Sequence, residues 1–366
     1  MVSSEHPLQI ESEIGRLQKV MLHRPGRELE RIIPGHLTES LFEDIPWLRR
    51  MQEEHDGFAR LLQANGVEVH YIEDLLKDVL HEASHREQLL KHILETSENC
   101  DKPVKRFLTE YLRDKSVEDF TDFLIGGVTK EDIKTFKKEK SLSDYIKEEH
   151  FFYVNPLPNL YFMRDPAMIL GRGIAIGAMY SEIRKRESQF FSLLNQHHPV
   201  FASVRDKTYY EPTCGHSVEG GGSLVLSKDT LAIGCSQRTG VAGIEQLADR
   251  LLNGTSNFKK LVVIQIPKNR AYMHLDTVFT MVDTDKFTVY PGILERVNVI
   301  TVTKGQDGYL DYCEEEGLKE GLKKQLNLPY VCLIPGGGED EVVAAREQWN
   351  DGVNTFALKP GTVFAY

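Results

Sequence analysis

The sequence predicts a mixed α/β fold that is interrupted by one all-helical segment. Through most of the 366 residues, short β-rich runs bounded by turn residues alternate with helical stretches. One stretch, Asp74–His150, is instead much richer in charged residues than the remainder and has helical spacing of its apolar positions. The length allows two domains and a core that needs no disulfide or metal to stabilise it.

The predicted elements outside the charged stretch follow one another in a mixed order. Strands are predicted at Lys19–His23, Val67–Ile72, Ala167–Met179, Ser223–Leu226, Thr230–Cys235, Leu261–Ile266, Val278–Asp283, Phe287–Tyr290, Val297–Val302, Tyr330–Ile334 and Thr362–Tyr366. Helices are predicted at Ile45–Asn65, Glu182–Leu194, Gly243–Leu252 and Glu314–Gln325.

The charged stretch Asp74–His150 is predicted to be a small helical bundle. Its apolar residues recur as adjacent pairs four positions apart, which forms one stripe along a helix. Ser116 and Thr129 each precede two acidic residues. A hydroxyl that caps the first turn, with acids at its positive end, is typical of a helix N-terminus.

Composition excludes several classes of function. The net charge of −11 provides no basic field for a nucleic acid or an anionic membrane surface. The longest stretch without a charged residue, Ser188–Val204, is too short and too polar to span a bilayer. The N-terminus lacks the apolar core of a secretory signal. Five scattered cysteines without a CxxC pair indicate reduced thiols, so we expect a cytoplasmic protein.

The tripeptide His274-Leu275-Asp276 is a first candidate for chemistry. It lies just before the apolar run that starts at Val278, and residues two apart in a strand project to the same face. An imidazole beside a carboxylate suits acid–base work or metal ligation. The pattern is short, so a purely structural role is an open alternative.

A second candidate is the polar set Asn159, Phe162, Arg164 and Asp165, which lies in a proline-rich context before an apolar run. Loops at strand ends are where a rigid scaffold carries ligand-binding groups. The alternative is that Arg164 and Asp165 form a surface ion pair beside an asparagine turn.

A third candidate is Glu219 with the glycines that follow it, Gly220–Gly222. Glycines let a backbone approach a ligand closely, but no Lys-Ser/Thr follows and the next element is a strand, which excludes a P-loop. The second triple glycine, Gly336–Gly338, is followed by acids, so we expect a tight turn there. No metal site is predicted, because no HExxH or clustered Cys/His spacing occurs.

Asp165, Glu219, His274 and Asp276 all lie near predicted strand ends. Carboxylates around one histidine suit a cationic group, and two carboxylates can clamp a planar guanidinium. Two arginines could hold a carboxylate at the other end of such a ligand, although each could equally be a surface base. They are Arg184, in a predicted helix, and Arg238, after a predicted strand. The set points to a free amino acid that carries a guanidinium.

The chain resembles the arginine deiminases of the guanidino-group modifying superfamily. The similar segments run in order over nearly the whole chain: Gly15–Gly26, Leu41–Pro46, Pro158–Pro166, Glu219–Gly221, Ser236–Thr239, Met273–Asp283 and Arg346–Gly352. The resemblance implies an α/β pseudo-five-fold propeller formed by residues 1–73 and 151–366, with a helical-bundle insertion at 74–150. The related dimethylarginine hydrolases lack that insertion, so it favours the arginine deiminase branch.

The resemblance also implies a reaction, L-arginine plus water to L-citrulline plus ammonia in arginine catabolism, without a cofactor. It implies that Asp165 and Asp276 grip the guanidinium and that Glu219 and His274 transfer protons, with Glu219 orienting the imidazole. The implied substrate-pocket residues are Asn159, Phe162, Arg184 and Arg238. A small-molecule substrate and a homo-oligomer are the expected partners.

The chain departs from the family pattern at two places. Gly222 stands where the family has an acid, and no cysteine follows Cys332, although the family has a cysteine nucleophile in a C-terminal Gly- and Arg-rich loop. We therefore expect the C-terminal part of the last blade and the nucleophile to be missing, with Cys214 as a conceivable substitute. One alternative is a truncated or degenerate member that binds a guanidino compound, or assembles with partners, without catalysis. A metal-dependent hydrolase that uses Glu219, His274 and Asp276 is another.

Overall fold

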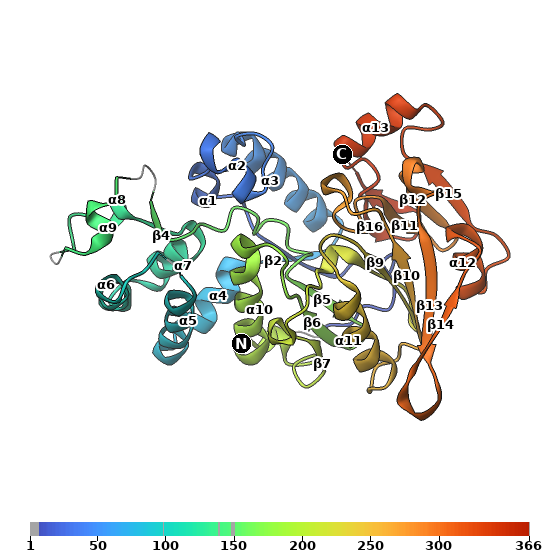
Figure 1. The fold of residues 1–366 in the computed structure, drawn as a ribbon, viewed down its shortest axis with the longest axis horizontal. Coiled ribbons are helices and arrows are strands. Elements are labelled where there is room, and N and C mark those ends of the chain that lie inside the picture. Colours follow the sequence, from blue (N-terminus) through green and yellow to red (C-terminus); the bar gives the residue numbers. More distant parts are fainter. Residues whose placement is uncertain (1–6, 98, 138–139, 148–150, 366) are drawn as a thin grey trace. The chain divides into compact units, whose positions relative to one another are not determined.

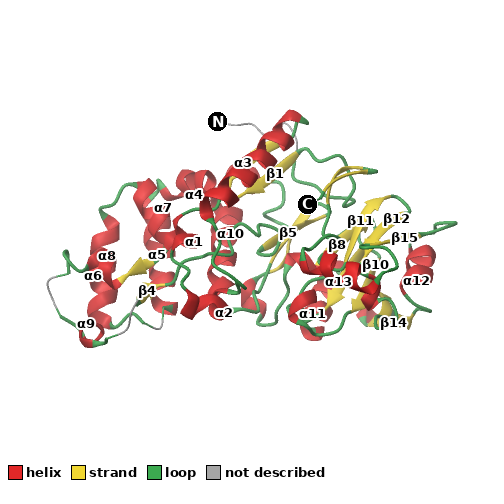
Figure 2. Cartoon of the chain, turned by 90° about the horizontal axis from the view of Figure 1, so that it is seen from above, coloured by secondary structure: helices red, strands yellow, loops and turns green. Residues whose placement is uncertain are grey.

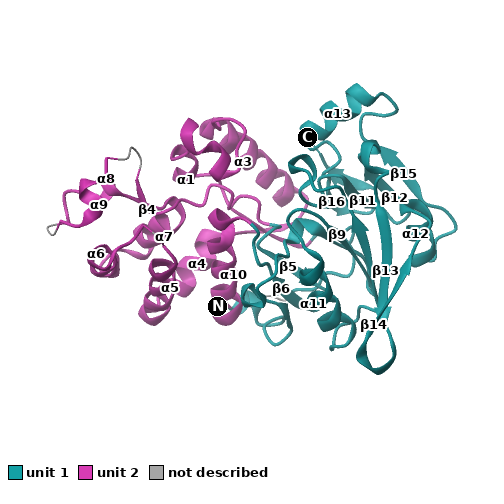
Figure 3. Ribbon diagram, in the orientation of Figure 1, with its two compact units in different colours: residues 1–17, 164–180, 199–366 teal, residues 18–163, 181–198 magenta. Residues whose placement is uncertain are grey.

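A computed structural model of the chain describes residues 7–97, 99–137, 140–147 and 151–365. Its elements have the mixed α/β composition that the sequence predicts (Figures 1 and 2). The ends of two predicted segments, His150 and Tyr366, lie outside the described residues. The chain forms two compact units (Figure 3). We call residues 18–163 and 181–198 the helical unit, and residues 1–17, 164–180 and 199–366 the sheet unit.

The helical unit contains most of the helices and two short strand pairs. Its helices are α1 (Arg27–Glu30), α2 (Leu37–Ser40), α3 (Leu48–Ala64), α4 (Ile72–Leu80), α5 (Ala83–Thr96), α6 (Lys102–Arg113), α7 (Val117–Gly126), α8 (Lys130–Ile133), α9 (Leu142–Tyr145) and α10 (Lys185–His197). Strand β1 (Lys19–Leu22) pairs in parallel with β2 (Glu68–Tyr71), and β3 (Val128–Thr129) pairs antiparallel with β4 (Phe152–Val154).

The two predicted helix starts in the charged stretch are confirmed. Ser116 Oγ accepts a hydrogen bond from the backbone N–H of Asp119 at 3.0 Å, at the start of α7. Thr129 and Asp132 form a reciprocal capping box at the start of α8. Helices α4 to α9 occupy the stretch, as expected for a helical segment, while the domain boundaries at 74 and 150 stay a prediction.

In its described residues, the sheet unit contains four sheets and three α-helices. Its strands are β5 (Ala167–Leu170), β6 (Gly173–Ile176), β7 (Thr208–Tyr210), β8 (Ser223–Ser227), β9 (Thr230–Cys235), β10 (Lys260–Gln265), β11 (Phe279–Asp283), β12 (Lys286–Val289), β13 (Asn298–Lys304), β14 (Leu310–Glu314), β15 (Cys332–Pro335), β16 (Phe356–Lys359) and β17 (Thr362–Phe364). Its helices are α11 (Val241–Leu252), α12 (Leu318–Gln325) and α13 (Glu341–Trp349). The strand orders are β5-β6-β7, β14-β13-β10-β9-β8, β11-β12-β15 and β16-β17.

The centre of the five-stranded sheet is buried on both faces, whereas its edge strand β14 is largely exposed. Along β10, Val262 and Ile264 pack into one apolar cluster, while Leu261 and Val263 pack into a second. Successive side chains of a strand point to opposite faces, so a run of apolar residues without alternation is what a doubly covered strand requires. Helix α11 contributes to the second cluster, and strands β11 and β12 contribute to the first.

Several element predictions need correction. The run Ala167–Met179 is not one strand, because Gly171, with φ +58°, turns the chain between β5 and β6. The helix predicted from Glu314 begins only at Leu318, since Glu314 ends strand β14. Helix α13 was not predicted at all. The tight turn at Gly336–Gly338 is confirmed.

Within the described ranges, none of the helices has the length and apolar character that crossing a bilayer requires.

Candidate active site

The centre of the candidate site is a hydrogen bond between two buried side chains of the sheet unit. Glu219 Oε2 lies 2.6 Å from His274 Nε2. The other oxygen of Glu219 accepts a hydrogen bond from the backbone N–H of Tyr180 at 2.8 Å, and the Glu219 N–H donates to Thr239 Oγ1 at 3.1 Å. The carboxylate has no exposed surface. Fully bonded on both oxygens, it fixes the orientation of the imidazole.

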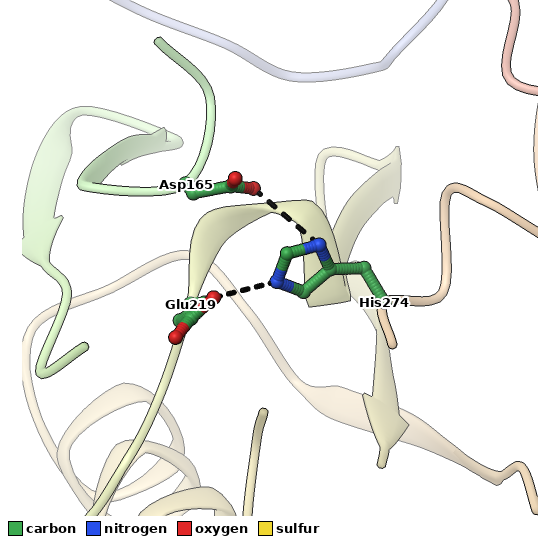
Figure 4. A group of neighbouring side chains, drawn as sticks. All are labelled: Asp165, Glu219 and His274. Carbon is green, nitrogen blue, oxygen red and sulfur yellow. Dashed lines mark hydrogen bonds and ion pairs between the residues drawn. The ribbon is translucent and has the colours of Figure 1, made fainter. Parts of the chain in front are cut away.

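Asp165 lies on the other side of the imidazole. His274 Nδ1 is 3.7 Å from Asp165 Oδ1, so the ring lies between two carboxylates (Figure 4). Asp165 is itself held by backbone groups, because Gly221 N–H donates to its Oδ1 at 3.2 Å and Gly220 N–H donates to its carbonyl at 2.9 Å. The structure therefore brings together three of the predicted catalytic residues from segments far apart in the sequence.

Two of the glycines after Glu219, Gly220 and Gly221, are required by close packing. A Cβ at Gly221 would lie 2.6 Å from Asp165 Oδ1 and 3.0 Å from the His274 ring, and a Cβ at Gly220 would lie 2.0 Å from the Arg164 carbonyl oxygen. Such distances leave no room for a side chain. The backbone here therefore closely approaches the protein's own side chains, Asp165 and His274, whereas the sequence predicted a close approach to a ligand.

The interpretation of His274 and Asp276 as residues of one strand was wrong. Both lie in a bend, and strand β11 begins only at Phe279. The chain turns here because Leu275, fully buried, packs into the core cluster while the Asp276 N–H donates to the Gly221 carbonyl at 3.1 Å. The bend still leaves the two polar side chains within electrostatic range of each other.

The charges around His274 favour its protonated form. Burial lowers the pKa of His274, but the charge of Asp165 and the hydrogen bond and charge of Glu219 outweigh burial and raise the pKa to about 9. At neutral pH the ring is therefore an imidazolium, with an N–H available toward each carboxylate.

Asp276 has the opposite balance. Burial raises the pKa of Asp276 to about 7, against the lowering effects of His274 and Arg164. Its Oδ1 is buried and accepts no hydrogen bond from any described residue. A buried carboxylate oxygen without a donor is costly, so the site has an acceptor that a cationic ligand could satisfy.

Arg238 is a buried guanidinium with open donors. The residue is 5% exposed, and neither Nε nor Nη1 finds an acceptor among the described residues. Its Nη2 lies 3.7 Å from Met273 Sδ, and the guanidinium lies 5.6 Å from the centre of the Tyr180 ring. Neither contact neutralises the charge. A carboxylate would supply both the missing charge and the missing acceptors.

The other three predicted pocket residues come together in the helical unit. Asn159 Nδ2 donates to the Ser40 carbonyl at 2.8 Å. Arg184 is not a surface base, and it lies in a 3₁₀ turn just before α10. Its Nη2 donates to Glu187 Oε2 at 2.9 Å and to the Phe162 carbonyl at 3.3 Å, and its guanidinium lies 5.8 Å from the centre of the Phe162 ring.

The five cysteines are all free thiols, with burial that ranges from buried (Cys100) to exposed (Cys313). Cys214 and Cys235 pack against the second apolar cluster, which argues against Cys214 as a substitute nucleophile. Burial raises the pKa of the Cys100 thiol to about 12, and its Sγ donates to the Tyr153 carbonyl. Within the described ranges, no hydrogen bond or ion pair joins any of the five sulfurs to Glu219 or His274.

Asp165, Glu219 and His274 could be considered as metal ligands, because their ligand atoms lie within 4.8 Å of one another. However, a metal that bonded both partners at about 2.0–2.2 Å would hold Glu219 Oε2 and His274 Nε2 roughly 3 Å or more apart. They are 2.6 Å apart. The geometry fits a shared proton better than a metal.

The expected alternative of a surface pair between Arg164 and Asp165 is wrong. Asp165 is buried, and Arg164 Nη2 donates to Glu13 Oε2 at 3.0 Å. Glu13, Thr239 and Tyr180 support the site but were not predicted. Thr239 could have been found, because it lies in a segment that carries the family resemblance.

Comparisons with known sequences all indicate the same protein family. A sequence profile of the arginine deiminase family matches residues 38–366. The chain is 43% identical over 366 residues to a protein named arginine deiminase from Bacillus cytotoxicus, covering 99% of this chain and 89% of that protein. It is 40% identical over 365 residues to an arginine deiminase from Listeria monocytogenes serotype 4a, covering 99% and 88%.

Among solved structures, the chain is similar to an amidinotransferase of the saxitoxin biosynthetic pathway from Microseira wollei. The TM-score is 0.50, with coverage of 97% of this chain and 84% of the other. At 14% sequence identity this similarity concerns the α/β fold alone.

Proposed function

The chain belongs to the arginine deiminase family, and from that premise we propose that it hydrolyses L-arginine to L-citrulline and ammonia. One observation carries the proposal. The sheet unit holds a buried acceptor without a donor, Asp276 Oδ1, and buried donors without an acceptor, Arg238 Nε and Nη1. A ligand with a guanidinium at one end and a carboxylate at the other would satisfy both.

In this proposal Asp165 and Asp276 bind the guanidinium. A planar guanidinium presents N–H groups in a fixed fork, which two carboxylates can match. The ligand's positive charge would also lower the pKa of Asp276 from about 7 and so favour the ionised form. Arg238 would bind the substrate carboxylate, and Asn159, Phe162 and Arg184 are the remaining proposed pocket residues.

His274 would move protons. Once a nucleophile has added to the guanidinium carbon, for which the resemblance implies a cysteine thiolate, the imidazolium can donate a proton to the departing nitrogen, so that ammonia leaves as the C–N bond breaks. The ring is then neutral and can take a proton from the water that bonds to the same carbon, displaces the nucleophile and supplies the oxygen of citrulline. Glu219 would keep Nε2 in place throughout, because its two oxygens are already fixed by His274 and Tyr180.

The position of the cysteines supports a second candidate function. The resemblance implies that a cysteine thiolate attacks the guanidinium carbon, yet Cys214 and Cys235 are partly buried against the second apolar cluster and burial raises the pKa of the Cys100 thiol to about 12. We assign none of the five cysteines as the nucleophile. The alternative is therefore a family member that binds L-arginine through the same residues without turnover.

Further features of the proposal rest on the resemblance. They are a pseudo-five-fold propeller that comprises residues 1–73 and 151–366, with the helical bundle 74–150 as an insertion. A cytoplasmic location, a homo-oligomer and activity without a cofactor complete it. The presence of several small sheets in the sheet unit is compatible with propeller blades.

The test is citrulline formation from L-arginine by the purified chain, alongside calorimetric binding of L-arginine. The control is His274→Asn, which removes the proton carrier and keeps a polar side chain of similar reach. Citrulline formed by the wild type and not by the control supports a deiminase. Binding without citrulline above the control supports the second candidate, and absence of binding contradicts both.

A further inference from the structure

Arg164 is the sequence neighbour of Asp165, but its guanidinium contacts residues from other segments of the chain. Its Nη2 donates to Glu13 Oε2 at 3.0 Å and to the Ser223 carbonyl at 2.7 Å. Its Nε lies 3.6 Å from Asp276 Oδ2. One end of the guanidinium is thus fixed by hydrogen bonds, while the other end faces the carboxylate that is proposed to bind substrate.

Glu13 is held in place by two hydrogen bonds to the backbone of strand β8. Its Oε1 accepts a hydrogen bond from the backbone N–H of Val225 at 3.0 Å, and its own N–H donates to the Val225 carbonyl at 2.7 Å. Both bonds attach it to strand β8, which lies directly after the glycines of the site. The position of Arg164 is therefore set by the sheet and does not depend on Asp276.

The distance between Arg164 and Asp276 is informative. At 3.6 Å the Nε attracts the carboxylate by charge but does not form a normal hydrogen bond, which requires about 2.7–3.2 Å. The Arg164 Nε and Asp276 Oδ1 both lack hydrogen-bond partners among the described residues. Arg164 thus contributes positive charge without occupying the Oδ1 acceptor that a ligand would need.

Four charged groups act on Asp276. The cations His274 and Arg164 favour its ionised form, while Asp165 and Asp351 oppose it. Burial also opposes ionisation, so the pKa of Asp276 is about 7 and the carboxylate changes its charge near neutral pH. The loss of one cation would shift that balance toward the protonated acid, which cannot attract a guanidinium.

We propose that Arg164, held by Glu13 and the Ser223 carbonyl, is a positioning residue that places its positive charge beside Asp276 and orients that carboxylate for a guanidinium ligand. The inference rests on the proposed function, because it assigns Asp276 to the guanidinium. It adds Glu13 and Arg164 to the residues on which that site depends.

The first test is the pH dependence of L-arginine binding, measured by calorimetry from pH 5.5 to 9 for the wild type, Arg164→Gln and Arg164→Lys. In Arg164→Gln the midpoint of the binding profile shifts upward by about one pH unit, since an opposite charge alters a carboxylate pKa by that order. Affinity therefore falls about tenfold below the midpoint and recovers at high pH. Arg164→Lys keeps the charge, so it retains the wild-type midpoint with weaker binding.

Two controls separate charge from folding. Arg172→Gln removes an exposed arginine of the same unit, hydrogen-bonded only to Gln9 at 3.2 Å in the described structure, and leaves the profile unchanged. Glu13→Gln loosens the anchor but keeps the Arg164 charge, so it weakens binding at every pH with little shift of the midpoint. An unshifted midpoint in Arg164→Gln, with an equal loss at every pH, would overturn the proposal.

The second test does not depend on L-arginine. A double-mutant cycle of Arg164→Gln and Asp276→Asn in the free chain, read by thermal unfolding, shows coupling at pH 8.5 and none at pH 5, where Asp276 is protonated. Coupling that is the same at both pH values, or absent at both, contradicts the inference. If the wild type binds no L-arginine, the proposed function fails while this cycle still decides the role of Arg164.

Discussion

Arg184 of the helical unit and Arg238 of the sheet unit are both buried, but they differ in how their positive charge is paired. In the helical unit, Arg184 forms two charge-assisted hydrogen bonds with the fully buried Glu187, from Nε at 3.0 Å and from Nη2 at 2.9 Å. In the sheet unit, Arg238 is as deeply buried but is left with two nitrogens that have no acceptor among the described residues. Because one arginine is paired within the chain and the other has nitrogens without a described acceptor, we propose that Arg238 binds an anionic group of a ligand.

The histidines repeat the contrast. His23 of the helical unit hydrogen-bonds Glu28 at 3.1 Å and also Glu73, and Glu28 in turn accepts from the Gly26 N–H. His274 of the sheet unit is likewise between two carboxylates, but a third, Asp276, stands beside it with an oxygen unoccupied. Glu73 Oε2 in the first cluster also lacks a described partner, so the two clusters differ in that the sheet unit also contains Arg238, whose Nε and Nη1 have no described acceptor.

The largest expected effect follows from breaking the closed pair. Arg184→Gln removes two charge-assisted hydrogen bonds from the fully buried Glu187, so the free energy of unfolding falls by about 3–5 kcal/mol. Urea unfolding monitored by circular dichroism measures it. The matched control is the neighbouring Lys185→Gln, which removes an exposed pair with Glu182 and changes stability by less than about 1 kcal/mol. Equal, small losses in both variants would contradict the closed-pair interpretation.

The open arginine is expected to respond in the reverse way. Arg238→Gln removes a charge that the free chain does not pair, so stability changes by less than about 1 kcal/mol, while L-arginine binds about tenfold or more weakly because a charged hydrogen bond is lost. Calorimetry with agmatine, which lacks the carboxylate, isolates the cause. The substitution leaves agmatine affinity unchanged, and an equal loss for both ligands argues against a carboxylate site at Arg238.

The raised pKa of His23 predicts that the stability of the chain depends on pH. Burial lowers the pKa of His23, but hydrogen bonds and charge from Glu28 and Glu73 outweigh it and raise the pKa to about 9. A raised histidine pKa contributes stability that is fully present below its usual value of about 6.5 and is lost as the pH rises through about 9. Thermal unfolding from pH 6 to 10 measures the loss.

His23→Asn is the control for that pH effect, and its melting temperature should decline less over the same range. Added L-arginine should leave the difference in melting temperature between His23→Asn and wild type unchanged, because His23 is bonded to Glu28 and Glu73 and is not one of the proposed ligand-binding residues. If the melting temperatures of wild type and His23→Asn changed in parallel with pH, this would contradict the raised pKa of His23.

The smallest expected effect concerns the departure at Gly222. A Cβ at this position would lie 3.1 Å from Thr239 Oγ1, which already accepts a hydrogen bond from the Glu219 N–H. Thr239 must move by a few tenths of an ångström, so Gly222→Ala costs about 1 kcal/mol or less and leaves L-arginine binding nearly unchanged. Complete loss of binding would mean that the open site depends on Gly222 far more than the packing indicates.

Local patterns predicted local structure well. Strand β9 was predicted with the bounds that it has, Thr230–Cys235, since a continuous β-branched and apolar run suits a strand buried on both faces. The Thr129 cap was predicted because its geometry involves only four consecutive residues. Helix α13 was missed, because Val342 and Val343 are exposed and no regular apolar stripe marks the helix.

The site was predictable in its residue types but not in its support. Asp165, Glu219 and His274 were proposed together, and they do lie together in the structure. The bend at His274 depends on Leu275 packing into a core formed by other strands, and the partner of Arg164, Glu13, is 151 positions away in the chain. Contacts of that kind leave no periodic trace in the sequence.

The most direct test of the open site is a crystal structure of the chain with L-arginine. We predict the guanidinium between Asp165 and Asp276, with a ligand nitrogen about 2.7–2.9 Å from Asp276 Oδ1, and the ligand carboxylate on Nε or Nη1 of Arg238. L-arginine bound elsewhere, with Asp276 Oδ1 and the Arg238 nitrogens still without partners, would contradict the central claim.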